Sequence, residues 1–202
     1  MCKECRATLS RCEGDICSKC GSPIRRSYCE ACAEFHYSFK LSRSAFHYGD
    51  AVKQLVHSLK YEELLGAGDV LAEGMTGYCS NNKSFAGFDT VVPVPLHRVR
   101  KRERGYNQSE YLARKLASSL GIPCSTTVTR QHYTASQTRL GKAQRTKNLS
   151  GAFRVKSLKA IQDKKIILVD DVFTTGSTVN EISKLLLDRG AKEVAVMTAA
   201  RA

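Results

Sequence analysis

The sequence predicts an α/β fold, with a parallel sheet flanked by helices and a small cysteine-rich module ahead of it. Three observations carry this prediction. Residues 164–197 follow a strand–helix–strand pattern, residues 91–121 follow a strand–loop–helix pattern, and seven of the nine cysteines lie within the first 32 residues. The 202 residues are 42% hydrophobic and 25% charged, which is typical of a folded chain and not of a disordered or fibrous one. We expect residues 1–38 to form the module and residues 39–202 the α/β domain.

The N-terminal cysteines have the spacing of metal ligands. Cys17/Cys20 and Cys29/Cys32 are two C-x-x-C pairs separated by eight residues. Two residues between cysteines allow a tight turn to direct both sulfurs at one ion, and two such turns complete a tetrahedral thiolate site. This spacing predicts a zinc ribbon with a structural Zn²⁺. Disulfides are the alternative, but they need an oxidising compartment, and the opening Met-Cys-Lys-Glu-Cys is unlike a secretory leader.

The role of the three remaining N-terminal cysteines stays open. Cys2, Cys5 and Cys12 could provide ligands to a second ion. Alternatively, Cys2 and Cys5 could replace one of the two pairs in the first site.

The segment from residue 91 predicts the first strand, loop and helix of the α/β domain. A short apolar strand with prolines at 93 and 95 precedes a cationic run that ends at Arg104, which we expect to be a loop. Asn107 and Ser109 are suited to begin a helix, and Gly121 with Pro123 is suited to end it. Apolar residues recur between them at helical spacing: Leu112, Leu116, Ala117 and Leu120.

The positive charge is concentrated in one part of the chain. Residues 90–160 carry 15 basic and two acidic side chains, which matches the formal net charge of +13 for the whole protein. Within this part, residues 137–148 are polar and basic and are expected to form a mobile loop. Such a concentration favours an anionic partner or substrate, although a solvated basic face is the alternative. No apolar run approaches the length of a membrane-spanning helix, so we expect a cytoplasmic protein without a span.

The C-terminal part predicts a βαβ unit. Ile166–Val169 is a continuous apolar run, typical of a strand buried on both faces, and Asp170 and Asp171 follow where that strand is expected to end. A helix with apolar residues on one face comes next and is closed by Arg189 and Gly190, before a second apolar run at Val194–Met197.

The segment between this strand and helix has the chemistry of a phosphate site. Backbone N–H groups, hydroxyls and the positive end of the helix suit a phosphate monoester, and they are offered by Thr174, Thr175, Gly176, Ser177 and Thr178. Asp170 and Asp171 lie where open α/β sheets bind ligands, and carboxylates there can accept hydrogen bonds from the vicinal hydroxyls of a sugar. The alternative is that the two acids only cap the helix.

Residues 169–178, Val-Asp-Asp-Val-Phe-Thr-Thr-Gly-Ser-Thr, resemble the phosphoribosyl diphosphate (PRPP) motif of type I phosphoribosyltransferases. The resemblance implies that Asp170 and Asp171 are the catalytic pair that holds the ribose hydroxyls, and that the residues from Thr174 to Thr178 hold the 5′-phosphate. Purine-salvage members place an acid where this chain has Thr174, which disfavours hypoxanthine–guanine salvage. Orotate, adenine and amidotransferase types stay open.

Further segments resemble the ComF family of competence-associated, phosphoribosyltransferase-like proteins, which joins a cysteine module to this domain. They are His57–Tyr61, Val92–Pro95, Arg102–Gln108, and Gln137–Leu140 with Arg145 and Asn148. The resemblance implies a pyrophosphate-binding segment at Leu96, His97 and Arg98, and a lid with Arg139 and Arg145. It also implies PRPP with Mg²⁺ as ligand, a role in DNA uptake and natural competence, and a competence helicase as partner.

Three functions are compatible with these features. The first is an enzyme that transfers the phosphoribosyl group of PRPP to an acceptor. The second is a module that binds single-stranded nucleic acid through the basic segment and through base stacking on Tyr106, Tyr111 and Tyr133. The third is PRPP sensing without turnover. We expect the first two in one protein.

Overall fold

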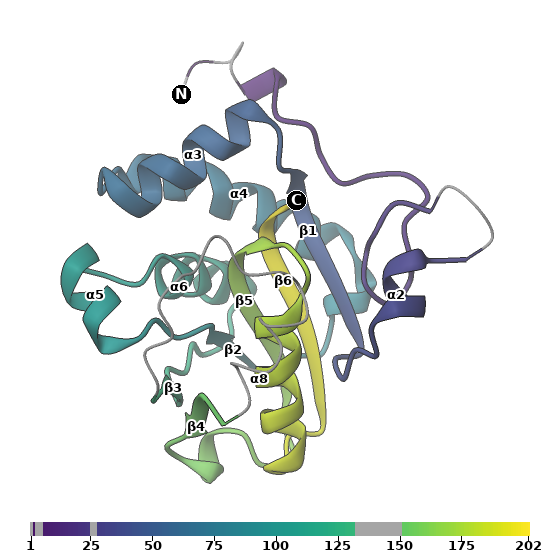
Figure 1. Cartoon of the computed structure of the whole chain (residues 1–202), viewed down its shortest axis with the longest axis vertical. Helices are drawn as coiled ribbons and strands as arrows, with labels where there is room; N and C mark the ends of the chain where they lie inside the picture. Colours follow the sequence, from purple (N-terminus) through teal and green to yellow (C-terminus); the bar gives the residue numbers. More distant parts are fainter. Residues whose placement is uncertain (1, 3–5, 25–27, 132–150) are drawn as a thin grey trace.

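A four-stranded parallel sheet forms the centre of the molecule. The computed structural model describes residues 2, 6–24, 28–131 and 151–202. The strand order is β1-β6-β5-β2, and every neighbouring pair is parallel. The strands are β1 (Leu41–His47), β2 (Thr90–Pro93), β5 (Lys165–Phe173) and β6 (Glu193–Arg201). Their carboxyl ends lie toward the top of Figure 1, and the predicted parallel sheet is confirmed.

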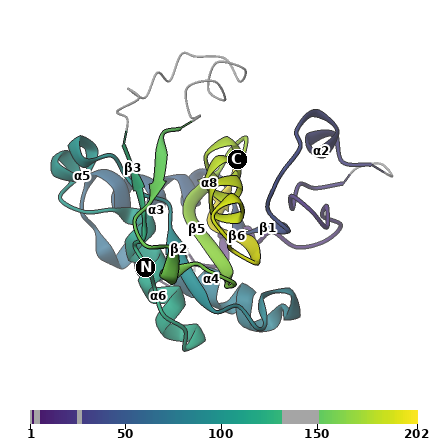
Figure 2. The same cartoon turned by 90° about the horizontal axis from the view of Figure 1, so that it is seen from below.

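Helices cover both faces of this sheet. α4 (Leu65–Asn81) and α6 (Gln108–Leu120) pack on one face, and α8 (Ser177–Asp188) packs on the other, as Figure 2 shows. α3 (Asp50–Tyr61) follows β1 and reaches the carboxyl end of β5 through an ion pair from Lys60. The short elements are α2 (Glu30–Glu34), η1 (Lys83–Phe85), α5 (Arg98–Arg104), β3 (Val128–Arg130), β4 (Phe153–Val155) and η2 (Leu158–Ala160).

The two apolar runs of the C-terminal part form the two central strands. Every side chain of Ile166–Val169 is inaccessible to solvent, and Val194–Met197 is almost equally buried. Helices on both faces bury both sides of such strands, which explains their continuous apolar sequence. The strand is longer than expected, because β5 continues through Asp170 and Asp171 to Phe173, pairing Asp170 with Thr198. The expectation that the acids follow the end of the strand is therefore wrong.

The segment at residues 62–88 contains α4, which packs very close to the sheet. A Cβ atom at Gly74 would collide with the ring of Phe46 on β1. Glycine weakens a helix interior by about 1 kcal/mol relative to alanine, but here it allows an approach that a side chain would prevent.

The cationic segment after β2 is a helix and not the expected loop. α5 spans Arg98–Arg104; the side chain of His97 accepts a hydrogen bond from the N–H of Val99, and Gly105 ends the helix with φ 78°. Arginine, lysine and glutamate are good helix formers, so a short polar helix can form without an apolar face. The predicted ends of α6 are confirmed, with Asn107 as N-cap and Gly121 in the left-handed region.

The residues described after position 150 begin with β4. β4 pairs antiparallel with β3 in a separate two-stranded sheet and does not join the central one. Among the described residues, no helix is both long enough and apolar enough to cross a membrane.

Candidate functional site

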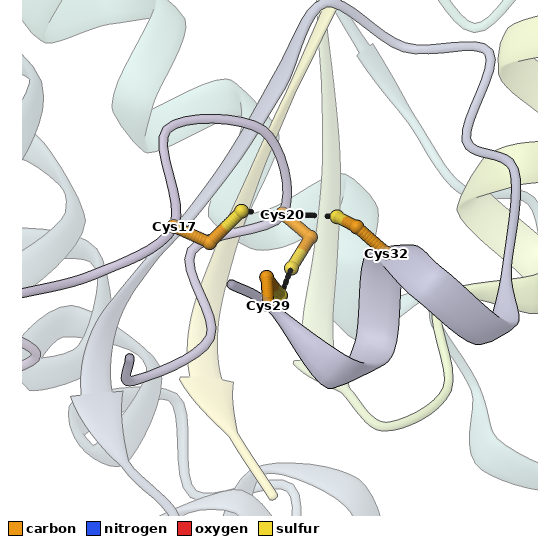
Figure 3. Close-up of side chains that lie close together, drawn as sticks. All are labelled: Cys17, Cys20, Cys29 and Cys32. Carbon is orange, nitrogen blue, oxygen red and sulfur yellow. Dashed lines mark hydrogen bonds between the residues drawn. The ribbon is translucent and has the colours of Figure 1, made fainter. Parts of the chain in front are cut away.

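Four cysteine sulfurs converge beside β1, as Figure 3 shows. Cys17 and Cys20 come from one turn, while Cys29 caps α2 and Cys32 lies within it. The four Sγ atoms lie within 4.8 Å of one another, with 3.7 Å between Cys17 and Cys32 and 3.5 Å between Cys20 and Cys29. A tetrahedral ion with Zn–S bonds of about 2.3 Å has sulfur–sulfur edges of about 3.8 Å, so the cluster is compatible with a structural zinc ion.

The thiols of the cluster differ in their ionisation: burial raises the pKa values of Cys29 and Cys32, while the pKa of Cys17 is lowered. Burial raises the pKa of the Cys17 thiol, but the backbone N–H groups of Cys20 and Lys19 offset this, and the pKa falls to about 7. A thiolate is the form that binds metal. Cys12 is buried apart from the cluster, with its pKa raised to about 11 by burial, and Cys2 is exposed. Cys5 lies outside the described residues.

The two acids near the end of β5 have different partners. Consecutive residues of a strand point to opposite faces, so Asp170 and Asp171 diverge. Asp170 Oδ1 accepts hydrogen bonds from Ser109 Oγ (2.8 Å) and from the backbone N–H of Asp171 (2.9 Å). Asp171 Oδ2 lies 2.8 Å from Lys60 Nζ on α3, and only 7% of the Asp171 side chain is exposed.

Burial and charge shift the ionisation of this group of residues. Burial and the neighbouring Asp171 charge raise the pKa of Asp170 from 3.8 to about 7, despite the opposing hydrogen bond from Ser109. Burial lowers the pKa of Lys60, but the Asp171 carboxylate more than offsets this and the pKa is raised. Lys60 therefore stays protonated and compensates one of the two negative charges.

The β5–α8 loop, Thr174–Gly176, turns sharply into α8. Gly176 has φ 75°, and a Cβ atom there would lie 2.5 Å from the ring of Phe173. The hydroxyls of Thr175 and Ser177 lie 2.8 Å apart, and Thr175 Oγ1 accepts from the backbone N–H of Ser177. Hydroxyls and the positive end of a twelve-residue helix therefore meet where the motif predicts a phosphate site.

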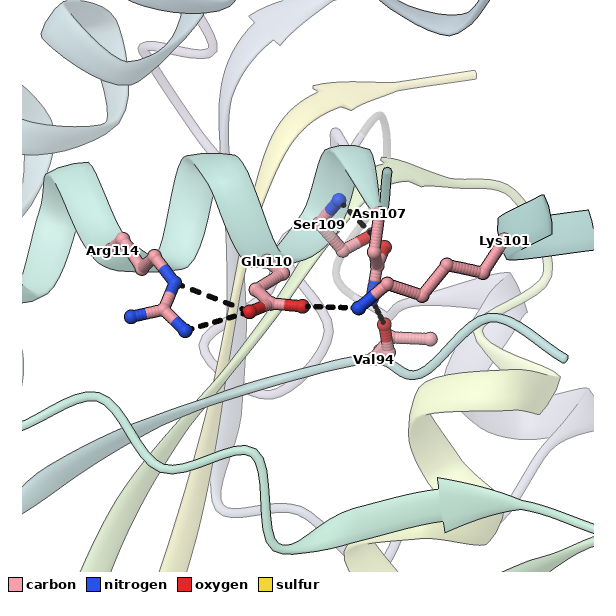
Figure 4. Close-up of polar contacts among 6 residues, drawn as sticks. All are labelled: Val94, Lys101, Asn107, Ser109, Glu110 and Arg114. Carbon is pink, nitrogen blue, oxygen red and sulfur yellow. Dashed lines mark hydrogen bonds and ion pairs between the residues drawn. The ribbon is translucent and has the colours of Figure 1, made fainter. Parts of the chain in front are cut away.

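The segment after β2 lies beside the acids. The N–H of Val94 donates to the carbonyl of Val169 on β5 (2.8 Å), and Asn107 Nδ2 donates to the carbonyl of Val94 (3.0 Å). Figure 4 shows how the start of α6 holds this region together, with Glu110 paired to Lys101 of α5 at 3.3 Å and to Arg114 at 2.7 Å. Asn107 thus joins the end of β2 to the helix that places Ser109 on Asp170.

A cationic pocket of about 460 Å³ opens next to this segment. Its lining includes Leu96 together with four cations: Arg98, Lys101, Arg130 and Lys156. Burial lowers the pKa of Arg130, and the nearby Arg100 charge lowers it further, while the Asp170 charge opposes the shift. The acids and the β5–α8 loop do not line this pocket, although β2 and β5 are adjacent strands.

Some residues were not identified as site residues from sequence. Lys60 pairs with Asp171, Ser109 bonds Asp170, and Tyr37 donates a hydrogen bond to the carbonyl of Thr175 (3.0 Å). Lys60 lies within the His57–Tyr61 segment, and its position one turn after Val56 on the amphipathic helix α3 was an available signal for the residue, although not for its partner. Arg139 and Arg145, the predicted lid residues, lie outside the described residues.

Comparison with known proteins gives consistent matches. The family model of the phosphoribosyl transferase domain matches residues 107–202, which include the acids and the β5–α8 loop. The DNA utilization protein YhgH of Salmonella typhimurium is 35% identical over 97% of this chain and 94% of its own. Competence protein F of Haemophilus influenzae is 31% identical over 100% of this chain and 96% of its own. Competence protein ComFC of Bacillus subtilis is 28% identical over 94% of this chain and 79% of its own.

The matches to YhgH and competence protein F extend over nearly the full length of both partners, so they span the N-terminal segment as well as the domain. The fold agrees, since a parallel sheet with helices on both faces carries the motif at its carboxyl edge. The chain therefore belongs to the ComF family of competence-associated, phosphoribosyltransferase-like proteins.

Proposed function

We propose that this protein binds PRPP with Mg²⁺ at the carboxyl ends of β5 and β2, in a role connected with the uptake or use of DNA. One observation carries the proposal: two acids, a hydroxyl-bearing turn and the start of α8 follow one another at one edge of the sheet. The names of the relatives, competence and DNA utilization proteins, supply the link to DNA.

The acids would hold the ribose. A carboxylate has about four lone-pair sites, so Asp170 and Asp171 keep acceptor capacity for the 2′- and 3′-hydroxyls beside their bonds to Ser109 and Lys60. Thr174, Thr175, Gly176, Ser177 and Thr178 would surround the 5′-phosphate. The conformation of Gly176 supports this, because a residue without Cβ brings the backbone close to a phosphate.

The cationic pocket would receive the pyrophosphate. Arg98 is exposed on the segment after β2, and Leu96 and His97 precede it. Guanidinium groups can bind two phosphate oxygens at once and would stabilise pyrophosphate as a leaving group. Mg²⁺ would arrive with PRPP, held mainly by phosphate oxygens and water. Zn²⁺ at Cys17, Cys20, Cys29 and Cys32 would be structural.

Titration calorimetry with PRPP and Mg²⁺ tests this proposal. We expect wild-type binding, and a loss of about 10- to 100-fold in Asp171→Asn, because charged hydrogen bonds to the ribose contribute about 1.5–3 kcal/mol each. Asp69→Asn is the matched control, since Asp69 is an ion-paired acid on α4 away from the site. Unchanged affinity in Asp171→Asn contradicts the proposed ribose site. Pyrophosphate release with candidate acceptors then separates transfer from sensing.

A second candidate function, binding of single-stranded nucleic acid, is favoured by one surface. Tyr61 is 63% exposed, with the Arg104 guanidinium 5.2 Å above its ring and the His57 ring at 4.9 Å. Exposed cations of α5, namely Arg98, Lys101 and Arg102, continue this surface. Exposed aromatic rings beside cations suit base stacking and phosphate contact.

The tyrosines expected to stack from sequence are less suited to it. The hydroxyl of Tyr106 donates to the carbonyl of Leu59, and the hydroxyl of Tyr111 donates to Asp69 at 2.7 Å. Both rings are partly buried against the apolar core. Tyr133 lies outside the described residues.

Fluorescence anisotropy with a labelled oligothymidine, titrated against salt, tests this surface. We expect Tyr61→Ala to weaken binding by about 1–3 kcal/mol, the range of one stacked base, without changing the salt slope. Arg102→Ala should instead lower the slope by about one phosphate contact. Tyr28→Ala, which removes another exposed tyrosine, is the control. Equal losses in the Tyr61 and Tyr28 variants argue against this surface.

A further inference from the structure

The cysteine cluster is built onto the same parallel sheet that carries the candidate site. The turn that holds Cys17 and Cys20 lies against β1, because the N–H of Ser42 donates to the carbonyl of Lys19 (2.7 Å). Arg43, also on β1, donates to the carbonyls of Cys17 and Ser18. The position of the thiolates is therefore linked to the sheet by several direct bonds.

Arg201 joins this turn to the end of β5. Its guanidinium donates to the carbonyl of Cys20 (2.7 Å) and to Ser22 Oγ (2.5 Å), and Ser22 Oγ lies 3.2 Å from Cys20 Sγ. The same guanidinium lies 4.4 Å from the centroid of the Phe173 ring. Arg201 is the last residue of β6 and pairs directly with Phe173 in the sheet.

The ring of Phe173 packs directly against the β5–α8 loop at Gly176. Its ring is buried and occupies the space that a Cβ atom of Gly176 would need. Tyr37 and Phe39 pack against the same ring at 6.2 Å and 6.3 Å. The conformation of Gly176, which begins α8, therefore depends on a ring held in place by Arg201.

A second connection runs through the segment between α2 and β1. Tyr37 donates its hydroxyl to the carbonyl of Thr175 (3.0 Å) within the loop. Asn180, in the first turn of α8, accepts from the N–H of Ser38 (2.6 Å) and donates to the carbonyl of His36 (3.1 Å). This segment starts directly after the helix that carries Cys32.

We infer that the four-cysteine cluster holds the β5–α8 loop in its ligand-binding conformation through two positioning residues, Arg201 and Tyr37. Binding of the metal and binding of a phosphosugar are then coupled, because both require the same arrangement of Arg201, Phe173 and Tyr37. The inference rests on the proposed function for the identity of the ligand, but the coupling itself is a property of the loop.

Hydrogen exchange of the backbone amides of residues 174–180, followed by mass spectrometry, tests the coupling without any ligand. In the zinc-loaded protein we expect exchange about fivefold faster in Tyr37→Phe, the equivalent of one neutral hydrogen bond, and about tenfold faster in Arg201→Met. Arg201→Lys keeps the cation above the ring and should lie between wild type and Arg201→Met. Lys40→Met, which breaks the surface ion pair to Glu193 at the opposite end of β6, should leave the loop unchanged.

Removal of the metal from wild type should accelerate loop exchange at least as much as Arg201→Met. In the double variant Tyr37→Phe/Arg201→Met, metal removal should accelerate exchange less than in wild type, because the bonds of Asn180 to Ser38 and His36 are the part of the connection that remains. Exchange within α6 serves as an internal reference for intact folding, and bound zinc is measured in every variant.

PRPP affinity separates failure of this inference from failure of the proposed function. The affinity for PRPP should fall about fivefold in Tyr37→Phe and about tenfold in Arg201→Met, the factors expected for loop exchange. The affinity for nucleic acid should stay constant in both variants. If wild type does not bind PRPP but loop exchange responds as described, the coupling stands and the ligand is wrong. If neither the variants nor metal removal changes loop exchange, the coupling is refuted, whatever the ligand.

Discussion

The cysteine module and the central sheet differ in how many side chains they bury. Among the described residues of the module, the buried positions are few: Cys12, Cys17, Cys20, Gly21 and Tyr37. The two central strands, in contrast, each contain a run of four consecutive residues that solvent hardly reaches: Ile166–Val169 and Val194–Met197. We therefore expect a segment of about 35 residues with so little apolar burial to need a cross-link to fold, and the sheet to be held by its own core.

The largest expected effect comes from breaking the cross-link. Structural zinc sites contribute on the order of 10 kcal/mol of apparent binding free energy, so we expect Cys20→Ser to unfold the module and leave the sheet folded. Limited proteolysis should then cut within residues 1–38, while far-ultraviolet circular dichroism retains most of its helical signal.

Cys124→Ser is the matched control, because Cys124 lies outside the cluster and is only partly buried. It should keep both the bound zinc and the protease resistance of the module. Simultaneous unfolding of module and sheet in Cys20→Ser contradicts the division into two differently stabilised parts.

The reverse experiment targets the core. Ile167 on β5 is fully buried between the helices, so Ile167→Ala should lower the free energy of unfolding by about 2–5 kcal/mol through lost burial and the cavity that remains. Urea unfolding measures this change, and bound zinc should stay at the wild-type level. Leu158→Ala, at a residue 51% exposed, should cost less than about 0.5 kcal/mol. A loss of zinc in Ile167→Ala shows that the module depends on the core more than its contacts indicate.

The same contrast explains what could be predicted from sequence. Short-range patterns were reliable: the apolar runs of β5 and β6, the cap at Asn107 and the end at Gly121 were all correct. C-x-x-C spacing placed four sulfurs together because the turn itself determines their geometry. Such features depend on residues only a few positions apart.

Features that depend on tertiary packing were missed. The side-chain pairs Lys60–Asp171 and Ser109–Asp170 join residues that are 111 and 61 positions apart, and no local pattern reports them. Helix α5 was mistaken for a loop because it has no apolar face and is held instead by caps and by Lys101 pairing with Glu110. The extension of β5 through the acids was missed for a similar reason, since its pairing with β6 continues where the apolar run has ended.

The smallest expected effect lies at the functional end of the otherwise well-packed β5. Burial and the adjacent Asp171 charge raise the pKa of Asp170 to about 7. Between the unfolded value of 3.8 and about 7, the folded protein retains a proton that the unfolded chain releases. The contribution of Asp170 to the free energy of unfolding is therefore fully present at acidic pH and is lost as the pH rises toward and through 7. Above neutrality the ionised Asp170 carboxylate destabilises the folded protein.

Asp170→Asn should remove this destabilisation, because the amide oxygen can still accept the hydrogen bond from Ser109 while no charge develops. We expect the variant to exceed wild type by about 1–3 kcal/mol at pH 8, with the difference shrinking toward pH 5. Urea unfolding at both pH values measures it. Asp69→Asn should show the opposite sign at pH 8, because the hydrogen bonds from Lys115 and Tyr111 lower the pKa of Asp69. A difference between Asp170→Asn and wild type that does not vary with pH means that Asp170 is already ionised at pH 5, which contradicts the raised pKa.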